Sequence, residues 1–382
     1  KKITTKSDLD EYLNNKFGKK KEKINQPDST LRLILELKTL QISSIRMNDS
    51  IAESLRSTWK TFSSGFGLIN EENLHYFAFL RMKGYVPSSD KDIKNLKVVK
   101  TVNTSHKKSI YRIVFLENEQ KFATASDDSS IILWNSSSGA VIHTFMGHTD
   151  RIWTLIKLGE IRLASGSSDH KIKIWNTQAL TLEKTLSWHT AFVCALLELP
   201  GNLLLSGSHD KCLKVWDYLT GKQIRSFKGE NQGKIMKIIW LNLDQVCVGS
   251  DSNINVYDFN QGKIEYTMTS HTALVRDLLL MDDLETLFST SDDHKIKMWN
   301  LISRECLRTF SGHTHSANLA LLFNKSTVVT ASDDSAIKFW NINNGTLVHT
   351  LTGHSSWVIY ITILKDGTLV SVGADKIVRF WG

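Results

Sequence analysis

The stretch "ASGSSDHKIKIWN", residues 164–176, decides the fold because it recurs along the chain at a nearly constant interval. Its end alternates polar and apolar residues, which predicts a half-buried strand that closes near Trp175. It also holds Ser165, Asp169 and His170 within six positions, and these are the residue types of a hydrolytic triad. Whether they are catalytic or structural depends on how often the pattern recurs.

Four residue series share one period of 41 or 42 residues. The aromatic series is Trp134, Trp175, Trp216, Tyr257, Trp299, Trp340 and Trp381. Six residues earlier stand Asp128, Asp169, Asp210, Asp251, Asp293, Asp334 and Asp375, and ten residues earlier stand Thr124, Ser165, Ser206, Cys247, Ser289, Thr330 and Ser371. The histidines, 27 or 28 residues earlier, are His106, His148, His189, His271, His313 and His354. A catalytic centre would occur once, so the repetition indicates a structural unit.

Each unit reads as four short strands separated by Gly, Asn and Asp, which is the length and texture of a propeller blade. The sequence resembles the WD40 repeat proteins through its "GH…WN" and "GH…WD" units, which cover residues 97–382. The resemblance implies an all-β fold, a closed seven-bladed β-propeller. It also implies that His, Ser or Thr, Asp and Trp of a blade form a buried hydrogen-bond chain, a tetrad, in all blades except the fourth.

The ring is expected to close through a strand from the start of the propeller. The seventh unit ends at Gly382 after its third strand, and residues 97–103 resemble an outer-strand segment without a blade before it. An open ring would leave a long unpaired edge. The predicted organisation is therefore a flexible basic tail at 1–24, a helical extension and linker at 25–96, and the propeller at 97–382.

The resemblance points to two positions in each blade that face a partner: the start of the first strand, and the residue before the turn Asp. The candidates are Tyr111, Arg151, Trp153, Phe192, Lys234, Arg276 and Trp357 at the first position, and Asp127, Asp292 and Asp333 at the second; the fourth unit places Ser250 there. Four aromatic residues come from adjacent blades of the closed ring and predict an aromatic arc suited to a binding hot spot. Together with the acidic residues, this arc would suit a peptide with an apolar anchor and at least one basic group.

The segment before the propeller predicts small helices. Pro27 and Asp28 favour a helix start, and Glu71 and Glu72 suit the first turn of a later helix. The segment faintly resembles an F-box through Pro27, Asp28, Leu31, Ile34, Leu35, Leu40 and Trp59. That resemblance implies docking of a cullin-ligase adaptor through residues 27–84, and the alternative is a helical unit held by ordinary apolar contacts.

Composition narrows the functional classes. The net charge is +8, and residues 1–96 carry 17 basic and 12 acidic residues, or +5 of it. The sequence has no apolar run of 18 residues, no paired cysteines and no motif for a nucleotide, a metal or a nucleophilic serine. We therefore expect a non-catalytic scaffold or adaptor, cytoplasmic or nuclear, without cofactor or metal, acting as a monomeric propeller within a complex. The alternatives are an F-box-type substrate receptor of a ubiquitin ligase and an RNA-associated assembly factor.

Overall fold

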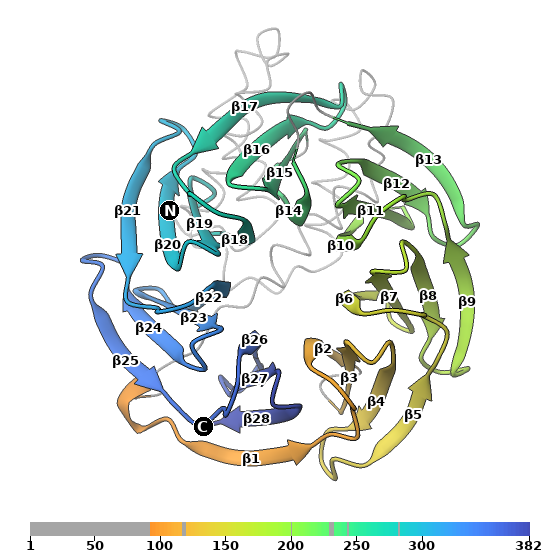
Figure 1. Cartoon of the computed structure of the whole chain (residues 1–382), viewed down its shortest axis with the longest axis horizontal. Coiled ribbons are helices and arrows are strands. Elements are labelled where there is room, and N and C mark those ends of the chain that lie inside the picture. Colours follow the sequence, from red (N-terminus) through yellow and green to blue (C-terminus); the bar gives the residue numbers. More distant parts are fainter. Residues whose placement is uncertain (1–91, 117–119, 200, 229–232, 243, 282) are drawn as a thin grey trace, which may run out of the picture. The chain divides into compact units, whose positions relative to one another are not determined.

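The computed structural model describes residues 92–382 except 117–119, 200, 229–232, 243 and 282. These residues form seven four-stranded antiparallel sheets, which stand around a ring like the blades of a propeller (Figure 1). No helix of this described part is long and apolar enough to cross a membrane. The predicted basic tail and most of the predicted helical extension, residues 1–91, lie outside the described residues.

Six blades take four consecutive strands from the chain, ordered from the centre of the ring to its rim (Figure 1). The first three are β2 (Ile110–Leu116), β3 (Lys121–Ser126), β4 (Ile131–Asn135) and β5 (Val141–Phe145); β6 (Ile152–Leu158), β7 (Arg162–Ser167), β8 (Ile172–Asn176) and β9 (Thr181–Leu186); β10 (Val193–Leu199), β11 (Leu203–Ser208), β12 (Leu213–Asp217) and β13 (Lys222–Phe227). The next three are β14 (Ile235–Trp240), β15 (Gln245–Ser250), β16 (Asn253–Asp258) and β17 (Lys263–Thr269); β18 (Val275–Leu280), β19 (Thr286–Ser291), β20 (Lys295–Asn300) and β21 (Cys306–Ser311); β22 (Ala317–Asn324), β23 (Thr327–Ser332), β24 (Ile337–Asn341) and β25 (Leu347–Leu351).

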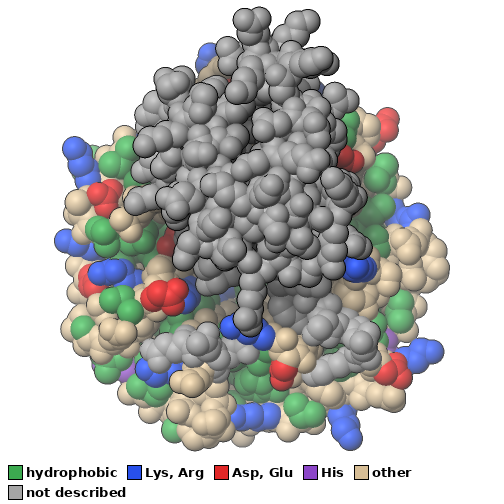
Figure 2. All heavy atoms as spheres, turned by 180° about the vertical axis from the view of Figure 1, so that it is seen from behind, with side chains coloured by type: hydrophobic (Ala, Val, Ile, Leu, Met, Phe, Trp, Pro, Cys, Tyr) green, Lys and Arg blue, Asp and Glu red, His purple; other side chains and the backbone are tan. Residues whose placement is uncertain are grey.

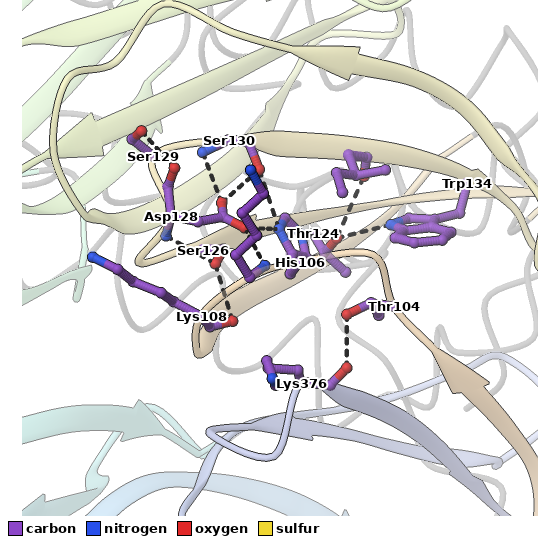
Figure 3. Close-up of polar contacts among 12 residues, drawn as sticks. Thr104, His106, Lys108, Thr124, Ser126, Asp128, Ser129, Ser130, Trp134 and Lys376 are labelled. Atoms are coloured by element: carbon purple, nitrogen blue, oxygen red, sulfur yellow. Dashed lines mark hydrogen bonds and ion pairs between the residues drawn. The ribbon is translucent and has the colours of Figure 1, made fainter.

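The seventh blade joins the two ends of the propeller. It consists of β26 (Val358–Ile363), β27 (Leu369–Gly373), β28 (Ile377–Trp381) and, on the rim, β1 (Val98–Asn103). The backbone groups of Lys97 and Gly382 exchange hydrogen bonds of 3.2 and 3.0 Å. The side chain of Thr104 donates to the carbonyl of Lys376 at 2.7 Å (Figure 3). β28 therefore has a partner on both sides, and the ring has no open blade.

The hydrophobic core lies between blades. One cluster joins Ile131 and Leu133 of the first blade to Ile152 and Trp175 of the second. The central strands are accordingly buried on both faces, as in β7, where only Arg162 is not fully buried. The rim strands β5 and β9 are fully buried only at their last residue, which explains their mixed composition. Each blade is thus stable only when its neighbours cover it.

In the fourth blade, the structure differs from the alignment that the repeat period predicts for the turn between the second and third strands. Gly207 of the third blade pairs with Leu213, and five residues lie between them. The equivalent pair in the fourth blade is Gly249 and Ile254, with four residues between them. This turn is one residue shorter, and counting back from Tyr257 therefore placed the preceding strand one position out of register.

Two predicted assignments in that blade change as a result. Val248, and not Cys247, occupies the Ser/Thr position, since it pairs with Asn255 as Ser206 pairs with Lys214. The amide of Asp251 donates to the carbonyl of Lys234 at 3.2 Å, which is the bond that precedes the turn Asp in other blades. Asp251 therefore takes the partner-facing position that the alignment gave to Ser250, and the fourth blade has no turn Asp.

The closing strand offers a direct stability test. Val102 is 6% exposed and packs against the seventh and first blades, whereas Val99 of the same strand is 57% exposed. Val102→Ala should lower the free energy of unfolding by about 2 kcal/mol, because it removes two buried methyl groups and leaves a cavity. Val99→Ala should change it by less than about 0.5 kcal/mol. Urea unfolding of the full chain measures both, and equal effects would contradict closure through β1.

Candidate functional site

The Ser, His and Asp residues of the second blade form one hydrogen-bond chain. Trp175 Nε1 donates to Ser165 Oγ at 2.8 Å, and Ser165 Oγ lies 2.7 Å from His148 Nε2. His148 Nδ1 lies 2.7 Å from Asp169 Oδ2. His170 is outside the chain, in the turn at φ 67°, and its ring contacts Phe192. The serine hydroxyl is fully buried, so no substrate could reach it.

The same chain recurs in all blades except the fourth, and Figure 3 shows it in the first. The sets are His106, Thr124, Asp128 and Trp134; His148, Ser165, Asp169 and Trp175; His189, Ser206, Asp210 and Trp216; His271, Ser289, Asp293 and Trp299; His313, Thr330, Asp334 and Trp340; and His354, Ser371, Asp375 and Trp381. Each bond gives a buried polar group its partner. The network joins the turn of a blade to the loop before it.

A second serine in the turn was not singled out from the sequence. Ser167 Oγ accepts a bond from the Asp169 amide at 3.0 Å and donates to the carbonyl of Asp150 at 3.0 Å. The equivalent residues are Ser126, Ser208, Ser291 and Ser332. Their regular place two residues before the turn Asp was the signal that could have found them.

Burial and hydrogen bonding set the pKa values within a tetrad. Burial lowers the pKa of His148, because it opposes the charged imidazolium more than Asp169 favours it. Burial also opposes ionisation of Asp169, but the bonds from His148, Lys171 and Thr149 outweigh it and lower its pKa to about 2. The pair is therefore a neutral histidine held by a carboxylate at neutral pH.

Every blade aims one side chain into the mouth of the central channel. The innermost strand of each blade shifts register near its start, which is a β-bulge that redirects a residue. The bulge residues are Tyr111, Trp153, Cys194, Met236, Arg276, Asn318 and Ile359. All seven line one cavity of about 190 Å³. The remaining lining residues are Arg112, Arg151, Asp333 and Trp357.

The predicted aromatic arc is partly assembled. The rings of Tyr111 and Trp153 meet edge to face at 5.0 Å, and Arg151 lies over them at 5.1 and 4.9 Å. Phe192 stacks near Trp153 at 6.5 Å but does not line the cavity. Trp357 lines it and is 49% exposed. The arc thus runs outward from the cavity over the first, second and third blades, and Trp357 is a separate part of the wall.

Two of the three predicted acidic residues form ion pairs with arginines. Arg151 bonds Asp127 at 2.6 Å, and Arg276 bonds Asp292 through two contacts of 2.6 and 3.0 Å. Asp333 lines the cavity and accepts a bond from Asn318 Nδ2 at 2.7 Å. Burial raises the pKa of Asp333. Of the three predicted acidic residues, Asp333 is therefore the one that no arginine neutralises.

Lys234 is exposed and does not line the cavity. A bond that the sequence did not reveal joins Trp153 Nε1 to Ser168 Oγ at 2.8 Å and fixes the indole. Within the described residues, no group of three or more His, Cys, Asp or Glu side chains could hold a metal ion. The site therefore combines aromatic, apolar and arginine side chains with Asn318 and Asp333 around one cavity.

Seven closed blades, with a His–Ser/Thr–Asp–Trp network in each except the fourth, define a class of propeller. The profile of the WD40 family, "WD domain, G-beta repeat", matches residues 97–135, 139–176, 180–217, 262–300, 304–341 and 345–382. The chain belongs to the WD40 family. The matched stretches leave out residues 218–261, which hold most of the fourth blade and its shortened turn.

Similarity to individual proteins is limited. The chain is 34% identical to striatin of Homo sapiens over 68 residues, which is 18% of this chain and 9% of that protein. Striatin of Mus musculus gives the same values. The chain therefore spans a small part of the curated relatives it matches. The crystal structure of the WD40 β-propeller domain of Doa1 superimposes with a TM-score of 0.66 at 22% identity, covering 75% of this chain and 97% of that one. That likeness shows the fold alone.

Removing one hydroxyl group tests whether the tetrad stabilises the blade. Ser165→Ala removes the atom that bridges Trp175 and His148 and leaves two buried nitrogens without a partner. At about 1–3 kcal/mol for each of the two orphaned groups, the free energy of unfolding should fall by about 2–6 kcal/mol. Ser187→Ala, at an exposed position before His189, should leave it unchanged. Denaturant unfolding distinguishes the two variants, and an unchanged stability of Ser165→Ala would contradict the structural role of the tetrad.

Acid should destabilise the propeller in two steps. Burial lowers the pKa values of His148, His189, His271 and His354, so the unfolded chain binds protons first as pH falls through about 6.5. Asp169 adds a loss below about pH 4, because its pKa is lowered in the fold. Stability is full above about pH 7 and declines downward through both windows. Urea midpoints at pH 7.5, 6, 4.5 and 3 measure this, and Asp169→Asn should shrink the lower step. A midpoint constant from pH 7.5 to 4.5 would contradict it.

Proposed function

We propose that this protein is a non-catalytic interaction scaffold whose channel mouth binds a peptide segment of a partner protein. WD40 propellers typically bind proteins or peptides, and this chain belongs to that family. The observation that carries the proposal is the convergence of all seven bulge residues on one cavity. A separate register shift in every blade builds a surface that no single blade could form.

The character of the cavity supports a peptide anchor. Trp357 leaves half its surface in solvent at the wall of a concave site, where an apolar partner group would cover it. Trp153 is held in place by a hydrogen bond to Ser168 and by contact with Tyr111 and Arg151. Binding a partner would therefore cost little additional side-chain entropy at this residue. A rigid wall and an exposed aromatic group are the usual parts of a hot spot.

The described chemistry favours binding over catalysis. The Ser, His and Asp sets are buried in tetrads. The thiol that lines the cavity, Cys194, has its pKa raised to about 12 by burial, so its reactive thiolate is not populated. Both observations support a scaffold and leave no activated nucleophile among the described cavity residues.

Charge distribution favours a protein partner over RNA. On the face in Figure 2, basic, acidic and apolar side chains alternate around the visible margin instead of forming a basic stripe. All four cysteines are free thiols, which supports a cytoplasmic or nuclear location. The proposed adaptor contact through residues 27–84, and with it an F-box-type role, falls outside the described residues and stays a prediction.

Peptides selected on the full chain from a random 12-residue phage library test the site. Trp357→Ala should weaken the selected peptides at least about tenfold, because it removes an exposed anchor of a hot spot. Trp188→Ala is the matched control, since Trp188 is 68% exposed but does not line the cavity. Fluorescence polarisation measures the affinities. Failure to select any peptide, or equal affinities for both variants, would overturn the proposal.

A further inference from the structure

The seven residues that directly follow the bulge residues in the innermost strands are called the second ring here. Each member follows a bulge in its innermost strand, and three of them are charged: Arg112, Lys237 and Asp277. Lys237 Nζ lies 2.6 Å from Asp277 Oδ1, and Asp277 is only 3% exposed. Neighbouring blades thus neutralise one cation of this ring.

Arg112 differs from the other basic residues of the channel. Its Nη1 donates to the carbonyl of Tyr111 at 3.0 Å, and its guanidinium lies 4.8 Å from the ring centroid of Tyr360. Within the described residues it has no carboxylate partner, whereas Arg151 and Arg276 each have one. The channel mouth therefore keeps one guanidinium whose charge is not balanced by a neighbouring blade.

The position of Arg112 makes this charge accessible to a ligand. It is half-buried and is the one member of the second ring among the residues that line the cavity. A guanidinium carries five N–H donors, and one of them is used by Tyr111. The cavity volume of about 190 Å³ holds several water molecules and so admits a charged side-chain head. Apolar walls from Met236 and Ile359 strengthen an ion pair formed there.

We propose that Arg112 is an oxyanion subsite of this cavity, which pairs with a carboxylate or phosphate group carried by the bound peptide. The inference rests on the proposed peptide-binding function and specifies its ligand. A planar guanidinium pairs with two oxygens of either group, which gives orientation as well as attraction. Of the three acidic residues that the sequence predicted for a basic ligand group, only Asp333 is left, because Asp127 and Asp292 hold Arg151 and Arg276.

Fixed-position peptide pools measure the preference on the full chain. Each pool is a degenerate, amidated 9-residue library whose central residue is Glu, Gln, phosphoserine or Ser, and one further Gln pool has a free C-terminal carboxylate. Immobilised protein should retain the Glu pool or the phosphoserine pool at least about fivefold over its neutral match, as charge-assisted bonds require. The pool that is enriched identifies the source of the oxyanion.

Variants assign the preference to Arg112. Arg112→Gln should abolish the enrichment, and Arg112→Lys should keep part of it, since the charge remains without the planar fork. Arg225→Gln is the matched control: Arg225 also donates to backbone carbonyls and lies over an aromatic ring, at 5.0 Å from Phe227, but on the rim strand β13. Thermal unfolding of each variant checks its fold. If Arg112→Gln does not fold, the Arg112→Lys change in enrichment decides.

The outcomes distinguish a failure of the oxyanion subsite from a failure of the proposed peptide-binding function. Pools that bind through Trp357 without any charge preference, or with a preference that survives in Arg112→Gln, overturn the oxyanion subsite and leave the peptide site standing. No retention of any pool, or retention unchanged by Trp357→Ala, overturns both. Enrichment that depends on Arg112 and not on Arg225, together with retention that Trp357→Ala weakens, supports both.

Discussion

The structure depends on a hydroxyl group that is placed between an indole and an imidazole. In the second blade, Ser165 accepts from Trp175 and faces His148, which in turn holds Asp169 in the turn. An apolar blade interior would make any one of these groups costly if it were alone. Together they fix the loop before a blade to the turn within it. In the six blades that have the network, it fixes the loop from which the innermost strand begins, whereas the fourth blade has its bulge at Met236 without the network.

The sequence reveals this constraint because it recurs. Trp, Asp, Ser or Thr, and His must stand at fixed separations in every blade that uses the network, so the period is visible without any structure. Residue spacing gave wrong assignments in the fourth blade because that blade lacks the network. Without a His–Asp pair its turn is free to lose a residue, and spacing counted from Tyr257 then misassigned Cys247 and Asp251.

The candidate site was less predictable because its contacts cross between blades. Tyr111 and Trp153 could be placed at the channel mouth from their position in the repeat, and both line the cavity. The sequence could not show that Asp127 of the first blade pairs with Arg151 of the second. Local spacing reports on the residues within one blade. The charge of the mouth depends on which residues of different blades face each other after closure.

The second ring shows how strongly such cross-blade pairing controls the charge. Lys237 and Arg112 occupy the same position of the repeat, one residue after the bulge. The blade beside Lys237 supplies Asp277 at the equivalent position, and the charge is neutralised. The blade beside Arg112 supplies Tyr360, whose ring centroid lies 4.8 Å from the guanidinium carbon and which carries no carboxylate to neutralise the charge. Because a ring stands there instead of a carboxylate, the four N–H donors of Arg112 that Tyr111 does not use remain available at the cavity.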